Sequence, residues 1–304
     1  MPVLLDLDTE FKEFIAKKGK INPTYSSAAS SSQYLDYRSE GNTRLTIDGG
    51  RHYKTPYGAL PSVTTILSAT SGSKAALERW AKKNPGGREA AARRGTRVHS
   101  LMEEYLLGIE KNPQIEDEEI AEFWDGLPEK LDKLERVIWA ENPANEGDFG
   151  WTMGGDGISR VWHPGIKEDE NWGWAGAPDI VAEYKGKVVL GDLKTSNGLY
   201  YSRWPGPDTP KNQYGMRRAG FLKYQKCMLQ MGAYAMALEH TVGITPELMM
   251  IFVATRERSQ VFAVQEMTIE KYKNKWLDTV KKYYTEILPA KKEEEIDFEV
   301  VIKD

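Results

Sequence analysis

The sequence contains a single cysteine, Cys227, among its 304 residues. One cysteine excludes an internal disulfide, a four-cysteine zinc site and a four-cysteine iron–sulfur cluster. No apolar run reaches the roughly 20 residues that a membrane-spanning helix requires. The first residues also lack the basic-then-apolar order of a signal peptide and the arginine-rich pattern of a transit peptide. We therefore expect a cytoplasmic protein with no membrane partner and no iron–sulfur cluster.

An excess of positive charge is also lacking, since the net charge is −4. With 40% hydrophobic and 28% charged residues, the composition is that of a soluble globular protein and does not by itself indicate nucleic-acid binding. The basic residues are nevertheless clustered, with eight Lys or Arg in residues 74–97 and five in residues 211–226. Such runs are usually solvated helix faces, so they gain meaning only beside a candidate site.

The pattern along the chain predicts helices and strands in alternation. Helices are expected at residues 6–18, 74–83, 88–107, 117–139 (with a break at 126–128 as an alternative), 216–239 and 269–287, and strands within 44–58, 180–190, 247–255 and 259–268. This order predicts an α/β fold with a mixed central β-sheet flanked by helices. The expected division is an N-terminal helix and flexible connector in 1–43, one domain in 44–290 with an insertion at 142–175, and an acidic tail in 291–304.

One predicted hairpin, GAPDIVAEYKGKVVLGDLKT at residues 176–195, carries an unusual set of charges. Two β-rich runs flank Lys185-Gly186, a dipeptide suited to a tight two-residue turn. With that turn, Asp179 lies directly opposite Asp192. Lys194 lies on the same face as Asp192, because side chains alternate along a strand. The hairpin therefore brings two carboxylates and one lysine together.

Like charges placed opposite each other destabilise a pair of strands. The neighbouring residues are apolar on both faces, so we expect the hairpin to be central and buried. Two buried carboxylates beside one lysine require a cation between them or a shared proton. The simpler alternative is a salt-bridged group at the end of a sheet. A bulge or a three-residue loop would also change the register.

Three further pairs of polar residues bear on these alternatives. They are His99 and Glu103, one turn apart on a helix, Gln230 and Tyr234, also one turn apart, and Ser62 and Thr64 in LPSVTTIL. Each pair has a structural explanation as well as a functional one. A helical histidine is often only a packed residue, a Gln-x3-Tyr pair fits a helix that packs on a sheet, and the two hydroxyls suit either a phosphate or a turn cap.

Taken in order, the motifs resemble the PD-(D/E)xK nuclease superfamily and its RecB-like branch, most of all the mitochondrial genome maintenance exonuclease family. The ordered set is a helical histidine, Pro178 followed by Asp-x12-Asp-x-Lys, and then Gln-x3-Tyr. The resemblance covers about residues 55–290. The chain departs from that family in the insertion, in a longer spacing between Lys194 and Gln230, and in lacking a mitochondrial targeting segment, so a bacterial or phage protein is expected.

The resemblance implies a restriction-endonuclease-like core that uses Mg²⁺ or Mn²⁺. The implied metal ligands are Asp179, Asp192, the carbonyl of Leu193 and His99. Lys194 would position or deprotonate the attacking water, and Gln230 and Tyr234 would hold the substrate backbone or orient Lys194. Glu103 would support the ligands or bind a second metal.

The implied substrate is single-stranded DNA with a free end. Aromatic residues interleaved with basic ones suit stacked bases, although they also suit packing against the domain. The candidate nucleic-acid contacts are Ser62, Thr64, Arg93, Arg94, Arg217, Arg218 and Trp204. Two alternatives stay open: a nuclease that resects the ends of duplex DNA, and a non-catalytic nucleic-acid-binding module on a nuclease scaffold.

Overall fold

The computed structural model describes residues 44–55, 57–72, 74–140, 160–165 and 172–290. The helix, connector and acidic tail expected within 1–43 and 291–304 lie outside the described residues, as does most of the expected insertion. The described ends of that insertion are strands β5 (Val161–His163) and β6 (Trp174–Gly176), which pair with each other and so belong to the fold.

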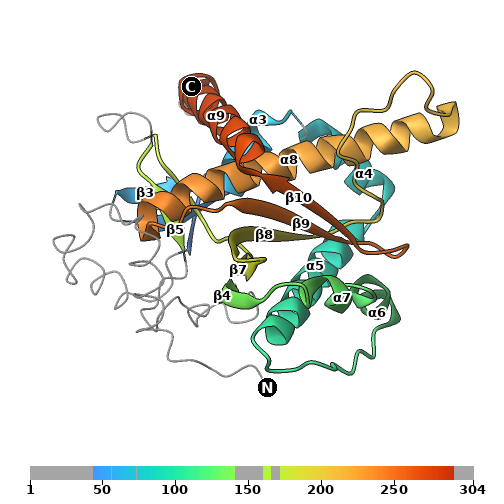
Figure 1. Cartoon of the computed structure of the whole chain (residues 1–304). Coiled ribbons are helices and arrows are strands. Elements are labelled where there is room, and N and C mark those ends of the chain that lie inside the picture. Colours follow the sequence, from blue (N-terminus) through green and yellow to red (C-terminus); the bar gives the residue numbers. More distant parts are fainter. Residues whose placement is uncertain (1–43, 56, 73, 141–159, 166–171, 291–304) are drawn as a thin grey trace.

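Among the described residues, a mixed sheet of five strands occupies the centre of the molecule (Figure 1). In spatial order the strands are β10 (Gln260–Gln265), β9 (Leu248–Ala254), β8 (Lys187–Thr195), β7 (Ile180–Tyr184) and β4 (Arg136–Ala140). Strands β8 and β9 are parallel, and the other neighbours are antiparallel. Strand β8 is therefore central, which is why it is apolar on both faces.

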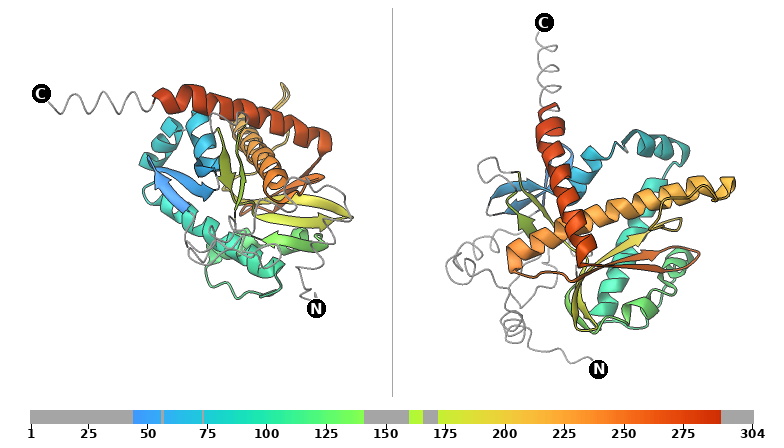
Figure 2. Two further views of the ribbon diagram at one scale, coloured as in Figure 1. Left: turned by 90° about the vertical axis from the view of Figure 1, so that its left-hand side faces the viewer. Right: turned by 45° about the horizontal axis from the view of Figure 1, so that its top comes forward.

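Helices cover both faces of this sheet, which confirms the predicted α/β class. On one face lie α8 (Lys211–Val242) and α9 (Glu266–Lys282), and on the other α5 (Gly87–Leu106), α6 (Glu118–Trp124) and α7 (Pro128–Leu131), as Figures 1 and 2 show. Because side chains alternate along β8, its residues pack into the cores on both faces of the sheet. Leu190 joins the core under α8 with Met231, and Leu193 joins the opposite core with Phe123.

A smaller, three-stranded sheet is formed by residues that come earlier in the sequence. Its strands are β1 (Arg44–Ile47), β2 (Gly50–Thr55) and β3 (Gly58–Pro61), followed by α3 (Val63–Thr70) and α4 (Lys74–Lys83). The strands predicted within 44–58 are confirmed, since β1 and β2 pair as a hairpin. Asp48 and Gly49 both have positive φ, 51° and 68°, as a primed two-residue turn requires. Helix α4 has its predicted bounds.

One predicted helix is wrong over much of its length. Residues 117–139 form two short helices, α6 and α7, and then the edge strand β4, which pairs with β7. The β-branched and aromatic residues of RVIWA favour a strand once a partner edge is present. Helix α8 begins at Lys211 rather than at 216, and α9 continues into a π-helical turn at Tyr283–Ile287. No helix in the described ranges is long and apolar enough to cross a membrane.

Candidate active site

The β7–β8 hairpin has the predicted register. Lys185 and Gly186 both have positive φ, 51° and 68°, so the connection is a two-residue turn. Pairing then runs in step from Tyr184 opposite Lys187 to Ile180 opposite Gly191. The turn therefore fixes which residues of β8 stand beside the beginning of β7.

Pairing stops one step before the two aspartates, so their predicted direct opposition does not form as a strand pair. The Oδ2 atom of Asp179 instead accepts a hydrogen bond of 2.7 Å from the backbone N–H of Leu193. The carboxylate thus occupies the position that a strand partner of Leu193 would take, just beyond the last residue pair of β7 and β8. Asp179 and Asp192 are both buried, with exposed fractions of 7% and 0%.

Asp192 is held from two elements. The Nζ atom of Lys194 lies 2.6 Å from Oδ2 of Asp192, and Nε2 of Gln230 on α8 donates to Oδ1 over 3.1 Å. The same Nε2 lies 3.2 Å from the hydroxyl of Tyr234. The structure therefore brings the predicted Gln-x3-Tyr pair to the predicted carboxylate. A Cβ atom on Gly176 would lie 2.5 Å from the Tyr234 ring, so that glycine permits the close packing.

His99 approaches from the opposite face of the sheet, on α5. Its Nδ1 lies 2.8 Å from the carbonyl oxygen of Gly95, and its Nε2 lies 3.2 Å from Oδ2 of Asp179. Glu103, one turn further on, is buried. The site therefore lies at the end of the sheet where groups from both helical layers meet at one pair of carboxylates.

The charges of the site compensate one another. Burial raises the pKa of Asp192 to about 6, and the charge of Asp179 adds to the rise. Burial also acts to raise the pKa of Asp179, but His99 and Lys194 outweigh it and lower this pKa. Burial lowers the pKa of His99, yet Asp179 more than offsets this and the pKa rises to about 9. Two carboxylates and two cations are therefore the ionised forms near neutral pH.

The high pKa of Lys194 differs from the lowered value that would suit a general base. Burial lowers the pKa of this lysine, but Asp192 and Asp179 together raise it well above its usual value. The pKa of Tyr234 is also raised, by burial and then by the same two carboxylates. Lys194 is therefore an ammonium and Tyr234 a neutral phenol at the site.

The donor set suits a hard divalent cation. Two carboxylates, one imidazole and a nearby carbonyl are the ligands that Mg²⁺ or Mn²⁺ accepts. The carbonyl of Leu193 points to the same edge of β8 as its N–H, which Asp179 accepts. Among the described residues, the buried Oδ2 of Asp192 contacts the ammonium of Lys194 and no other donor. In this arrangement no three His, Cys, Asp or Glu side chains of the described residues form a metal-binding group.

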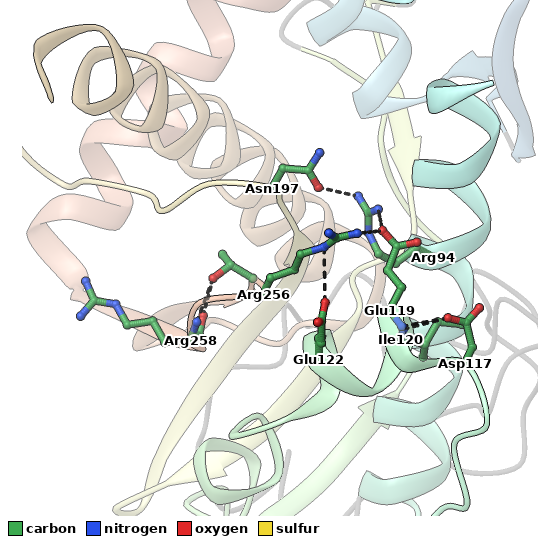
Figure 3. Close-up of polar contacts among 9 residues, drawn as sticks. Arg94, Asp117, Glu119, Ile120, Glu122, Asn197, Arg256 and Arg258 are labelled. Carbon is green, nitrogen blue, oxygen red and sulfur yellow. Dashed lines mark hydrogen bonds and ion pairs between the residues drawn. The ribbon is translucent and has the colours of Figure 1, made fainter. Parts of the chain in front are cut away.

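The two predicted arginines on α5 differ in their surroundings. Arg93 is exposed, whereas Arg94 is buried and binds residues of two other segments (Figure 3). Its guanidinium donates to Glu119 of α6 over 2.9 Å and to Asn197, after β8, over 3.1 Å. Arg256, after β9, also binds Glu119. Arg93 is thus available to a ligand, and Arg94 is a brace between α5 and the end of β8.

The remaining predicted contacts lie in two places. Ser62 caps α3, accepting from the N–H of Thr65 over 3.0 Å, while Thr64 is exposed beside it. The basic and aromatic residues lie on the first turns of α8 and on the loop before it. There Arg218 lies 5.8 Å from the ring centroid of Trp204. Arg217 lies 5.4 Å from that of Tyr201.

Two residues that meet at the end of β8 were not assigned to the site from the sequence. Ser196 follows Lys194 by two positions and so continues the same face of β8. Lys223 precedes Gln230 by seven positions and so shares its face of α8. Both spacings are visible in the sequence, but Lys223 there belongs to a basic run and Ser196 to no motif.

Comparisons with known proteins add no assignment: no family model matches the chain, and no curated protein matches it significantly.

Proposed function

We propose that this chain is a metal-dependent DNA exonuclease with a restriction-endonuclease-like core, of the PD-(D/E)xK superfamily that its motifs resemble. The observation that carries the proposal is the meeting of Asp179, Asp192 and Lys194 at the end of the central hairpin, with His99 and Gln230 beside them. These residues come from three elements that are far apart in the sequence. Packing alone gives no reason to gather four ionised groups, two of them buried carboxylates and two of them half-buried cations.

The chemistry would be hydrolysis of a phosphodiester bond. A bound Mg²⁺ or Mn²⁺, held by Asp179, Asp192, His99 and the Leu193 carbonyl, would polarise the phosphate and lower the pKa of an attacking water. Lys194 keeps its proton because its pKa is raised, so it is suited to stabilise negative charge on the phosphate and to position the water rather than to remove a proton. Gln230 fixes the Asp192 carboxylate through its amide.

The proposed substrate is single-stranded DNA with a free end. The first half of α8 extends beyond the central sheet (Figure 1), and it carries Arg217 and Arg218, each over an aromatic ring. Trp204 is 48% exposed, so its ring is accessible to a base. Stacked rings beside cations are typical of surfaces that bind single strands without sequence preference. Such an activity would serve DNA replication, recombination or repair.

A second candidate function is a nucleic-acid-binding module without catalysis. It is favoured by one observation: Lys194 and His99 already pair with the two carboxylates. Because the four charges balance, the buried carboxylates do not by themselves require a metal ion.

Cleavage assays separate these candidates. Labelled linear single strands, closed single-stranded circles and duplexes are incubated with Mg²⁺, with Mn²⁺ or with a chelator. We expect metal-dependent cutting of the linear single strand, and loss of cutting in Asp192→Asn and Lys194→Ala with DNA binding retained. Asp278→Asn, on an exposed position of α9, is the matched control.

Cutting of duplex ends in preference to single strands would identify the resecting nuclease. Rapid cutting of circles would contradict the need for a free end. Binding without any cutting in either metal would favour the non-catalytic module.

A further inference from the structure

A second lysine lies on the same side of the sheet as Asp192 and Lys194. Lys223 stands two helical turns before Gln230 on α8, and residues seven apart share one face of a helix. The Nζ atom of Lys223 donates to Oγ of Ser196 over 2.9 Å and lies 5.9 Å from the ring centroid of Tyr200. Although the residue is exposed overall, its ammonium is tied to the end of β8.

Ser196 is a fixed anchor for this lysine. It is buried, and its N–H donates to the carbonyl of Ala254 over 3.0 Å, which continues the pairing of β8 with β9. Its hydroxyl donates to the carbonyl of Gly198 over 2.8 Å, so a lone pair of Oγ is left to accept from Lys223. The backbone of Ser196 therefore continues the direction of β8, and the hydrogen bond to Gly198 orients its hydroxyl group.

The charge of Lys223 is not compensated within the described part of the chain. No carboxylate there pairs with it, and of the three N–H donors of an ammonium only one is used by Ser196. Two other lysines of the described residues differ in this respect. Lys194 pairs with Asp192 at 2.6 Å, and on α9 Lys273 pairs with two glutamates. Lys223 is thus a positioned cation with free donors, which suits an anionic ligand.

We propose that Lys223, anchored by Ser196, binds the DNA phosphate next to the one that is cut. This inference rests on the proposed nuclease function. Alternate residues of a strand are about 7 Å apart, so the row Asp192, Lys194, Ser196 advances by steps similar to those between neighbouring phosphates of one DNA strand. Beyond this row, α8 continues toward Arg217 and its ring. The Lys223–Ser196 pair therefore makes cutting depend on a second, charged phosphate.

Oligonucleotides with one uncharged methylphosphonate linkage test the proposal. The linkage is moved one position at a time along a linear single strand, and kcat/KM is measured for the first cut. For the wild type, one position beside the cut should lower kcat/KM by about 10- to 100-fold, the loss of a charge-assisted hydrogen bond. In Lys223→Ala that position should cause no further loss. Lys275→Ala, which removes an exposed lysine that also lies over a tyrosine ring, is the matched control and should keep the wild-type pattern.

Three outcomes are decisive. A Lys223→Ala variant that cuts as fast as the wild type overturns the subsite. So does a slow Lys223→Ala variant that keeps the full sensitivity to the uncharged linkage, because its defect then lies elsewhere. A wild-type protein that cuts none of the oligonucleotides in Mg²⁺ or Mn²⁺ overturns the proposed nuclease function, and the subsite with it. Melting temperatures of all variants confirm that each is folded.

Discussion

We expect Mn²⁺ binding to release a proton from His99. Both ring nitrogens of this histidine face acceptors, Nδ1 the carbonyl of Gly95 and Nε2 the carboxylate of Asp179. An imidazole with two acceptors is held as the imidazolium, and although burial lowers the pKa of His99, Asp179 raises it to about 9. A histidine binds a metal ion only when it is neutral. The metal and the proton therefore compete for the same nitrogen.

The size of the effect follows from this pKa. At about pH 7, roughly two units lower, only ~1 in 100 of the His99 side chains is neutral, which weakens Mn²⁺ binding about 100-fold, or about 2.7 kcal/mol. The affinity should thus rise by nearly tenfold for each pH unit between about 6 and 8. Calorimetry at about pH 7 in two buffers of different ionisation enthalpy measures the released protons directly. We expect about one proton per bound Mn²⁺.

The variant His99→Gln supplies the control, because a carboxamide has no proton to release in this range. The pH dependence of the free energy of unfolding, measured in chelator, is a second test, and the pKa of His99 predicts the direction of the change. A histidine pKa raised on folding stabilises the protein fully below the unfolded value near 6.5, and this stabilisation is lost as the pH rises through about 9. The wild type should lose up to about 3 kcal/mol over that window relative to His99→Gln. Equal heats in the two buffers, with equal pH profiles, would refute the reasoning.

Much of the site could be predicted from the sequence because a short-range feature, the turn of the β7–β8 hairpin, determines which residues lie together. A two-residue turn at Lys185-Gly186 sets the register of the hairpin, and alternation then places Asp192 and Lys194 on one face. The position of Asp179 could not be predicted in the same way. Strand pairing ends at Ile180, and the Asp179 carboxylate accepts a hydrogen bond from the N–H of Leu193. This contact depends on the side-chain conformation of a residue outside the paired strands, which the strand register does not determine.

Properties that depend on contacts between distant segments were not predictable. Arg93 and Arg94 are neighbours in one basic run, but helix phase directs only the second to Glu119, 25 residues away. The edge strand at Arg136–Ala140 looks helical by its local pattern and becomes a strand because β7 offers an edge to it. The charge states of the site also depend on groups from three elements, so the spacing of the motifs could suggest a metal site but not the balance of its charges.

Two further predictions concern stability. In chelator at about pH 7, Asp192→Asn should raise the free energy of unfolding by about 1–3 kcal/mol, because burial and the charge of Asp179 disfavour the Asp192 carboxylate and raise its pKa. A less stable variant in denaturant titrations would instead mean that the ion pair with Lys194 outweighs both effects. On α8, a Cβ atom at Gly220 would lie 2.3 Å from the carbonyl oxygen of Leu199, whereas one at Gly215 meets nothing within 4 Å. Alanine favours a helix over glycine by about 1 kcal/mol. Gly215→Ala should therefore stabilise the protein. Gly220→Ala should destabilise it by about 1–3 kcal/mol and weaken single-strand binding, because the backbone that carries Tyr200 has to move. Equal melting temperatures and DNA affinities for the two variants would show that this close approach does not position the loop.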